Sequence, residues 1–152
     1  MLTAENIGVT LGNTAILSGL DYRAAPGQVS AIVGPNGSGK TTLLRVLTGE
    51  CAASGQVRLN GRDVATARPW ELAERRAVLP QASALSFPFN VLEVVRLAGG
   101  GARDRSAQAL ARVGLAGYEG RFYQELSGGE KQRVQLARAL TQIWDPVANG
   151  EP

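Results

Sequence analysis

Histidine is absent from this 152-residue sequence, and cysteine, lysine and long apolar runs are scarce. Without histidine, the chain cannot carry the Ser-His-Asp or Cys-His arrangements of nucleophilic enzymes, and most metal sites are excluded as well. The single cysteine, Cys51, allows no internal disulfide, which fits a reducing compartment such as the cytoplasm.

No apolar run approaches the roughly 18 residues of a membrane-spanning helix, and the first residues do not resemble a signal peptide. Any membrane association is therefore expected to come through a partner. The net charge is +3, but Lys40 and Lys131 are the only lysines and the arginines form no run. This distribution argues against a nucleic-acid surface, for which a clustered basic patch is typical.

Composition and periodicity predict one compact globular domain of mixed strands and helices. Hydrophobic residues make up 44% of the chain and charged residues 19%. Alternating residues predict two antiparallel strands at 2–10 and 16–24, with a turn at Gly12-Asn13. The apolar run 29–33 predicts a strand buried on both faces of a parallel sheet. Further strands are predicted at 56–60 and 77–79, and helices at 41–48, 69–76, 91–98, 106–113 and 130–143.

A glycine-rich segment directly follows the run 29–33. It matches the phosphate-binding pattern G-x-x-x-x-G-K-[ST] between a predicted strand and a predicted helix. Glycines let successive N–H groups point at phosphate oxygens, and the helix adds the positive end of its dipole. Lys40 is expected to reach the β- and γ-phosphates, the Thr41 hydroxyl to ligate Mg²⁺, and Thr42 to offer one more backbone donor. The predicted nucleotide-binding residues of this segment are Gly34, Pro35, Asn36, Gly37, Ser38, Gly39, Lys40, Thr41 and Thr42.

A second glycine-rich segment, Ser127-Gly128-Gly129-Glu130, opens the last predicted helix. Ser-x-x-Glu is a capping box, in which Ser127 caps the N3 amide and Glu130 reaches back to the N-cap amide. Gly128 and Gly129 have no side chains, so the helix start is bare backbone with unpaired N–H groups. Such a helix start is a candidate for a second anion site.

The two motifs, in this order and with no coiled coil between them, resemble the ATP-binding subunit of ABC (ATP-binding cassette) transporters. The resemblance covers essentially the whole chain. It implies an α/β fold of the P-loop NTPase, ABC ATPase type, with an antiparallel β subdomain, a partial parallel-sheet core and a helical subdomain. Within one incomplete ATP-binding domain, 1–152, it implies a nucleotide-binding core and β subdomain at 1–81, a helical subdomain at 82–126 and the signature helix and tail at 127–152.

The resemblance also implies roles for individual residues, with ATP and Mg²⁺ as the cofactors. Two cassettes of this family hold two ATP molecules head to tail, so Ser127 to Glu130 would contact ATP bound by a second copy. Gln81 matches a glutamine that approaches Mg²⁺ and the attacking water and that senses the permease. Leu11 falls where many members carry an aromatic residue that stacks on adenine, and a leucine offers only apolar contact there.

The segments 78–81 and 85–95 are similar to those of importers for hemin, and more broadly for ferric siderophores and cobalamin. Residues 87–89, Phe-Pro-Phe, lie where such subunits meet their permease. The implied location is the inner face of the cell membrane. The implied partners are membrane permease subunits, a second copy of the chain and, indirectly, a substrate-binding protein, with no nucleic acid.

The family pattern continues with an apolar strand ending in Asp-Glu and a loop with a histidine, and neither follows Leu140 here. We therefore expect a fragment or truncated product without a catalytic residue of its own, in which the run 29–33 lies unpaired at a sheet edge. General-base catalysis typically contributes about 10²–10⁴-fold, so hydrolysis near background is expected. Two alternatives to an importer subunit stay open: a hydrolysis-deficient nucleotide-binding module and a soluble, non-transport ABC protein.

Overall fold

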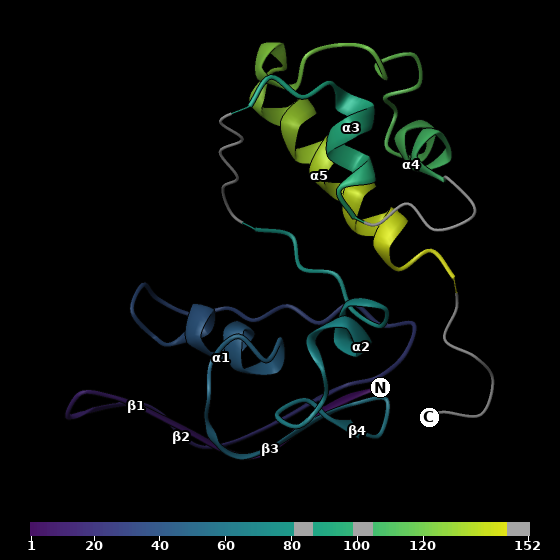
Figure 1. The fold of residues 1–152 in the computed structure, drawn as a ribbon. Coiled ribbons are helices and arrows are strands. Elements are labelled where there is room, and N and C mark those ends of the chain that lie inside the picture. Colours follow the sequence, from purple (N-terminus) through teal and green to yellow (C-terminus); the bar gives the residue numbers. More distant parts are fainter. Residues whose placement is uncertain (81–86, 99–104, 146–152) are drawn as a thin grey trace. The chain divides into compact units, whose positions relative to one another are not determined.

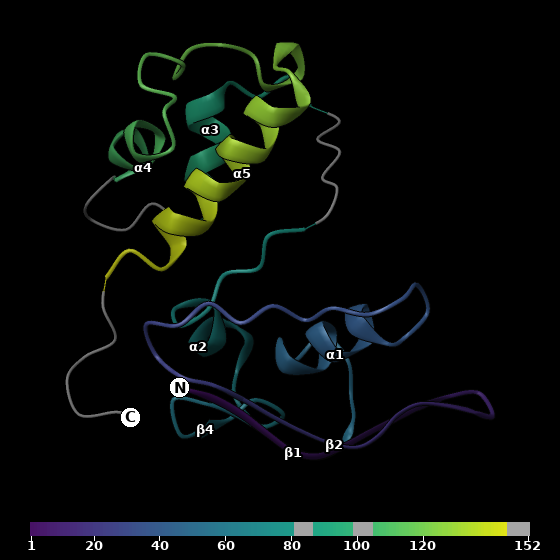
Figure 2. The same ribbon diagram turned by 180° about the vertical axis from the view of Figure 1, so that it is seen from behind.

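The computed structural model of the chain describes residues 1–80, 87–98 and 105–145. These residues form two compact units, one ending at Leu72 and one beginning at Ala73, which we call the β unit and the helical unit. Figures 1 and 2 show both units from opposite sides. The subdomain boundary at 81/82 stays a prediction, because the structure does not describe residues 81–86.

The β unit is built on a four-stranded antiparallel sheet in the order β2-β1-β3-β4. The strands are β1 (Leu2–Leu11), β2 (Thr14–Ala24), β3 (Ser54–Leu59) and β4 (Arg62–Asp63). The tight turn at Gly12-Asn13 joins β1 and β2 as the sequence predicts, and Asn60-Gly61 joins β3 and β4. The short strand β4 was not predicted, because two residues carry no periodic signal.

A bulge in β1 decides which side chains face the core. Asn6 has a φ of 51°, and the pairing register of β1 with β3 shifts between Glu5 and Gly8. The extra residue lets both Ala4 and Ile7 be buried, three positions apart, where regular alternation would place them on opposite faces. Gly55 lies against the bulge, and a Cβ there would be 2.4 Å from the Asn6 carbonyl oxygen.

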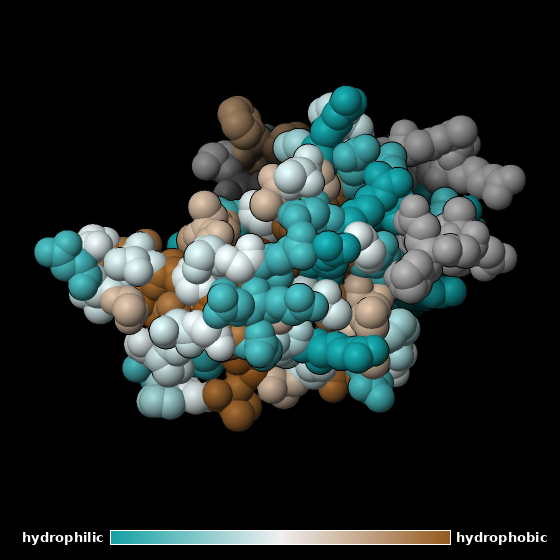
Figure 3. Space-filling view, turned by 90° about the horizontal axis from the view of Figure 1, so that it is seen from below, coloured by the Kyte–Doolittle hydropathy of each residue, from teal (hydrophilic) through white to brown (hydrophobic). Residues whose placement is uncertain are grey.

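Helix α1 (Lys40–Leu47) covers one face of this sheet (Figures 1 and 2). Its buried residues Leu43, Val46 and Leu47 join the apolar core that the strands provide. The core of the β unit consists of Ala4, Ile7, Val9, Leu17, Leu43, Val46, Leu47, Val57, Val64 and Leu72. Figure 3 views this unit from the opposite side of the sheet, where hydrophilic and neutral residues prevail and apolar side chains appear in separate groups.

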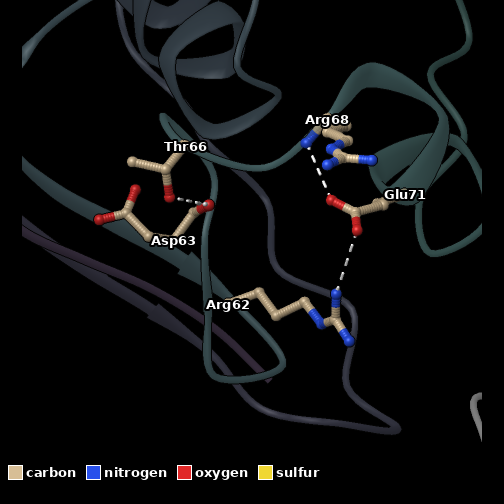
Figure 4. A network of polar contacts seen from close by, with 5 residues as sticks. All are labelled: Arg62, Asp63, Thr66, Arg68 and Glu71. Carbon is tan, nitrogen blue, oxygen red and sulfur yellow. Dashed lines mark hydrogen bonds and ion pairs between the residues drawn. The ribbon is translucent and has the colours of Figure 1, made fainter.

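Helix α2 (Pro69–Ala73) is tied to β4 by a surface network, shown in Figure 4. The Arg68 backbone N–H donates to the Glu71 carboxylate at 3.0 Å, and the Arg62 guanidinium lies 3.6 Å from the other oxygen of that carboxylate. The Arg68 guanidinium also lies 5.2 Å from the ring centroid of Trp70, which is 58% exposed. α2 ends three residues earlier than predicted.

The segment 29–33 is not a strand in this structure, contrary to the sequence prediction. Val29 and Val33 are 101% and 87% exposed, and only Ile32 packs against the core. The prediction for 77–79 is wrong in the same way, because Val78 and Leu79 are exposed and belong to no strand. A strand requires a hydrogen-bonding neighbour, and within the described ranges no strand pairs with either segment.

The helical unit packs α3 (Val91–Arg96) and α4 (Ser106–Arg112) against the long helix α5 (Gly128–Gln142). A one-turn 3₁₀ helix, η1 (Tyr123–Glu125), precedes α5 and was not predicted. Its core consists of Val91, Val94, Val95, Ala109, Leu110, Leu115, Tyr123, Leu126, Val134 and Ala137. In the described part of the chain, no helix is long and apolar enough to cross a bilayer.

Two contacts hold the C-terminal end of α5 in the helical unit. The Gln142 side-chain amide donates to the carbonyl oxygens of Ala73 and Arg76, at 2.9 and 3.0 Å. Trp144 lies between two arginines of the α4 region, with ring-centroid distances of 5.7 Å to the Arg105 guanidinium and 4.5 Å to that of Arg112. The chain after α2 is thus bound to α5 instead of continuing as a helix.

Candidate nucleotide-binding motifs

The glycine-rich segment before α1 forms a tight loop closed by its own lysine. The Lys40 ammonium donates to the carbonyl oxygens of Gly34 and Pro35, at 2.8 and 2.6 Å. The Ser38 amide donates to the Pro35 carbonyl at 3.3 Å. Gly37 and Gly39 have φ values of 80° and 85°, a conformation that glycine adopts at little cost. The loop is therefore folded around Lys40, with the ammonium at its centre.

The start of α1 is open to an anion. Gly39 occupies the N-cap position and has no side chain, so no side chain accepts from the first amides of the helix. Gly37 is exposed, and no atom lies within 4 Å of where its Cβ would be. An open backbone, a helix dipole and the nearby ammonium together fit a polyphosphate group. Thr41 lies exposed in the first turn, where its hydroxyl can act as an oxygen ligand for Mg²⁺.

Strand β2 supports this loop, a contribution that the sequence analysis missed. A Cβ on Gly39 would lie 3.0 Å from Leu17 Cδ2 and 3.3 Å from Ile16 Cγ2. The apolar side of β2 therefore packs directly against the glycine that begins α1. Leu11, the predicted adenine contact, lies at the end of β1 beside the hairpin turn and is 57% exposed. The role of Leu11 as an adenine contact stays a prediction.

The second motif forms the capping box that its sequence predicts. The Ser127 backbone N–H donates to the Glu130 carboxylate at 2.8 Å, and the Ser127 hydroxyl donates to the same oxygen at 2.7 Å. The Glu130 amide in turn donates to Ser127 Oγ at 3.4 Å. Gly128 and Gly129 are exposed, and nothing lies within 4 Å of where their Cβ atoms would be. Both glycines are therefore exposed at the positive end of α5, where the first amides of a helix have no intrahelical acceptor.

The capping box also changes the acidity of Glu130. The hydrogen bond from the Ser127 hydroxyl, and then the bond from the Ser127 backbone, lower the pKa of the Glu130 carboxyl below its ordinary value of 4.5. Glu130 is therefore ionised at neutral pH. The Ser127 hydroxyl hydrogen is used within the motif, which leaves the backbone amides of the two glycines as its outward-facing donors.

The residues that lead into this motif are held firmly in the helical unit. Tyr123 and Leu126 are buried, and the Tyr123 amide donates to the Phe89 carbonyl at 2.9 Å. The Lys131 ammonium donates to the Gln124 carbonyl at 2.9 Å. The sequence offered no signal for these contacts, because they join segments that lie far apart along the chain.

The two motifs belong to different units, the loop before α1 to the β unit and the capping box to the helical unit. Gln81, the predicted Mg²⁺ and water contact, lies outside the described residues. Within the residues that the structure describes, no group of three or more His, Cys, Asp and Glu side chains could hold a metal ion. Of the two predicted Mg²⁺ contacts, only Thr41 lies within the described residues, and its role stays a prediction.

The chain is similar to known proteins in both sequence and fold. A family model described as "ABC transporter" matches residues 17–144. The "Hemin import ATP-binding protein HmuV" of Jannaschia sp. is 65% identical over 100% of this chain and 58% of its own length. The protein of the same name from Roseobacter denitrificans is 60% identical over 99% of this chain and 60% of its own length. The chain thus spans about 60% of the length of these curated relatives.

Solved structures agree with this assignment. A bacterial Atm1-family ABC exporter with ATP bound superposes with a TM-score of 0.81 at 29% identity, over 93% of this chain and 27% of the other. A nucleotide-free ATP-binding cassette from an ABC transporter gives a TM-score of 0.80 at 29% identity, over 93% of this chain and 64% of the other. These likenesses confirm the predicted ABC ATPase fold.

Proposed function

Because the chain belongs to the ABC transporter family, we propose that it is the ATP-binding part of a subunit that powers import through a membrane permease. The transported compound in this proposal is hemin, which the names of the relatives from Jannaschia sp. and Roseobacter denitrificans contain, or a related iron chelate. The subunit would act at the inner face of the cell membrane, bound to permease subunits and paired with a second copy of itself. A substrate-binding protein would deliver the cargo.

The observation that carries this proposal is the loop before α1. Lys40 lies at its centre, and the uncapped amides at the start of α1 supply donors for phosphate oxygens. ATP would bind with its phosphates in this loop and with Mg²⁺ at the Thr41 hydroxyl. When bound, Mg²⁺ neutralises charge on the phosphates. Residues Gly34 to Thr42 would hold the nucleotide, and Leu11 would give apolar contact to its base.

The second motif would serve the nucleotide of the partner copy. Gly128 and Gly129 are exposed at the start of α5, and the amides of a first helical turn, which lack intrahelical acceptors, can receive an external phosphate. Gln81 is proposed to sense Mg²⁺ and the permease on the strength of the sequence resemblance alone. Ser127 and Glu130 shape the helix start through their mutual hydrogen bonds.

Replacing Lys40 tests the proposed nucleotide site. We expect Lys40→Ala to weaken binding of ATP–Mg²⁺ by at least about a hundredfold, because the ammonium is the one side-chain charge directed at the phosphates. Isothermal titration calorimetry of both forms measures this loss. Lys131→Ala, which removes the other lysine of the chain, is the matched control and should leave the affinity unchanged. Equal affinities for the unaltered chain and Lys40→Ala would refute the proposed site.

The alternative to an importer subunit is a nucleotide-binding module that does not hydrolyse ATP. The observation in its favour is that these 152 residues include no histidine, the residue that the family pattern carries in a loop after its Asp-Glu strand. No acidic residue following a buried apolar strand is found in the described ranges that could serve as general base. For these 152 residues by themselves we therefore expect ATP turnover near background, because general-base catalysis typically contributes about 10²–10⁴-fold. A phosphate-release assay at concentrations that favour dimers decides this. Robust turnover that Lys40→Ala abolishes would show that another residue acts as base, with Glu125 and Glu130 to be replaced first.

A further inference from the structure

A buried hydrogen bond lies directly behind the second motif. The Gln135 side-chain amide donates to the Tyr123 hydroxyl oxygen at 3.0 Å. Tyr123 is 3% exposed and Gln135 is 5% exposed, so both side chains are withdrawn from water. Buried polar side chains of this kind are costly unless they are paired, so this bond links η1 firmly to α5.

The bond lies on the side of α5 that carries Gly128. Gln135 follows Gly128 by seven residues, which is close to two helical turns and places both on one side of the helix. Tyr123, Gln135, Gly128 and Gly129 all line one cavity of about 720 Å³. Tyr123 and Gln135 therefore lie next to Gly128 and Gly129, whose backbone receives the partner's nucleotide in the proposed function.

Tyr123 also fixes the direction from which the chain enters α5. Its amide is bonded to Phe89, its carbonyl oxygen accepts from the Leu126 amide at 3.3 Å, and Ser127 follows at once as the N-cap. The Lys131 ammonium, bonded to the Gln124 carbonyl, lies 5.9 Å from the centroid of the Tyr123 ring. Residues 123–126 are thus held on one edge by the loop at Phe89 and on the other by α5.

Gln135 has no alternative partner that would compensate for the loss of this bond. Its side-chain oxygen is buried and, among the residues described, has no hydrogen-bond partner. Removing the Tyr123 hydroxyl would leave the whole buried carboxamide unpaired. An unpaired carboxamide is expected to reorient or draw in water, and η1 and the first turn of α5 would then shift relative to each other.

We propose that Tyr123 and Gln135 are positioning residues that set the orientation of the Gly128 and Gly129 amides toward the nucleotide held by a second copy of the chain. The proposal rests on the proposed function, because it assigns these amides the role of contacting the partner's ATP. Neither side chain touches the nucleotide itself. Their effect is confined to the association of two copies around ATP and leaves binding at the loop of the same chain untouched.

Three variants of the chain test this role: Tyr123→Phe, Gln135→Met and the double variant. Analytical ultracentrifugation with and without ATP–Mg²⁺ measures association, and calorimetry on dilute protein measures ATP affinity of the single chain. We expect each single variant to weaken ATP-dependent association about fivefold or more, with the calorimetric affinity unchanged. The double variant should lose less than the sum of the two single losses, because both single variants remove the same bond.

Two controls distinguish a changed orientation of the first turn of α5 from destabilisation of the whole helical unit. Tyr22→Phe removes a phenolic hydroxyl in the β unit and should change neither association nor affinity. Hydrogen exchange of the amides of Val94 and Val134 should be the same in all variants, since the core of the helical unit is left intact. Faster exchange throughout that core, or additive losses in the double variant, would overturn the positioning role.

Further variants distinguish failure of this inference from failure of the proposed function. Gly128→Glu places a negative charge where the phosphate is proposed to lie, in space that is open in this structure, and should abolish ATP-dependent association. If Gly128→Glu and Lys40→Ala act as expected while Tyr123→Phe associates like the unaltered chain, the inference alone is refuted. If the unaltered chain shows no ATP-dependent association, or Gly128→Glu leaves it intact, both are refuted.

Discussion

Helices α1 and α5 both begin with exposed glycine-rich backbone, but their N-caps and the burial of the preceding residues differ. α1 follows a left-handed Gly39 with no side-chain cap, whereas α5 follows an extended Ser127 whose capping box is complete. The chain leading into α1 is exposed at Val29 and Val33, whereas the chain leading into α5 is buried at Tyr123 and Leu126.

The difference shows how the geometry of each proposed anion site depends on the residues around it. The start of α5 is shaped by contacts within the helical unit, so its geometry is present without any ligand. The start of α1 depends on Lys40 and on the contact of Gly39 with β2, while the residues before the loop contribute little packing. We therefore expect the α1 site to gain more order from its ligand than the α5 site does.

The largest difference is expected between the amide hydrogen-exchange rates of the residues that precede α1 and those that precede α5. The Ile32 and Val33 amides should exchange at nearly the rate of an unfolded chain, because 29–33 is not part of a strand. The Tyr123 amide, bonded to Phe89, should be protected at least about a thousandfold, as the typical stability of a folded domain allows. Exchange followed by NMR or mass spectrometry measures both. Strong protection at Val33 would show that another contact covers this segment.

An intermediate contrast is expected for alanine at the two helix starts. Gly39→Ala should destabilise the β unit by about 1–3 kcal/mol, because φ is 85° and the new Cβ would lie 3.0 Å from Leu17. Gly128→Ala is the matched control and should change stability by less than about 0.5 kcal/mol, because its Cβ would meet nothing within 4 Å. Urea unfolding of both variants measures the difference. Equal losses would show that crowding at Gly39 does not limit the loop.

The smallest contrast is expected in the response to acid. Because the pKa of Glu130 is lowered in the folded chain, its contribution to the α5 cap is complete above about pH 4.5 and is lost as the pH falls through the lower folded value. Acidification should therefore speed exchange of the amides near Ser127, while those of the α1 start, which has no carboxylate cap, should show no such step. NMR titration from pH 6 to pH 3 measures this. The variant Glu130→Gln should remove the pH dependence, and a step that persists in it would exclude Glu130 as the cause.

The sequence predicted those features that depend on neighbouring residues. The turn at Gly12-Asn13, the helix after Lys40 and the capping box of Ser127 are each specified within a few residues. The ABC ATPase fold was implied by the resemblance of the two glycine-rich motifs to those of a known family. The turn, the helix start and the capping box are determined by residues close together in the sequence, so they can be predicted without knowing the contacts of distant segments.

The errors concern features that require a distant partner. The apolar run 29–33 has the composition of a buried strand, but composition cannot supply the neighbouring strand that such a segment needs. The bulge at Asn6 breaks the alternation on which strand predictions rest, and its fit depends on Gly55 in another strand. The Tyr123–Gln135 bond likewise joins residues whose proximity only the folded chain reveals.

The placement of the tryptophans gives each unit its own optical label. The chain has two tryptophans, the exposed Trp70 in the β unit and the half-buried Trp144 between Arg105 and Arg112 in the helical unit. Because indole emission shifts to shorter wavelengths away from water, the two side chains fluoresce in different environments. Trp70 is already exposed to water, so its emission should shift little when the β unit unfolds. Trp144 is partly buried, so a shift of the emission to longer wavelengths should report unfolding of the helical unit, most clearly in the variant Trp70→Phe.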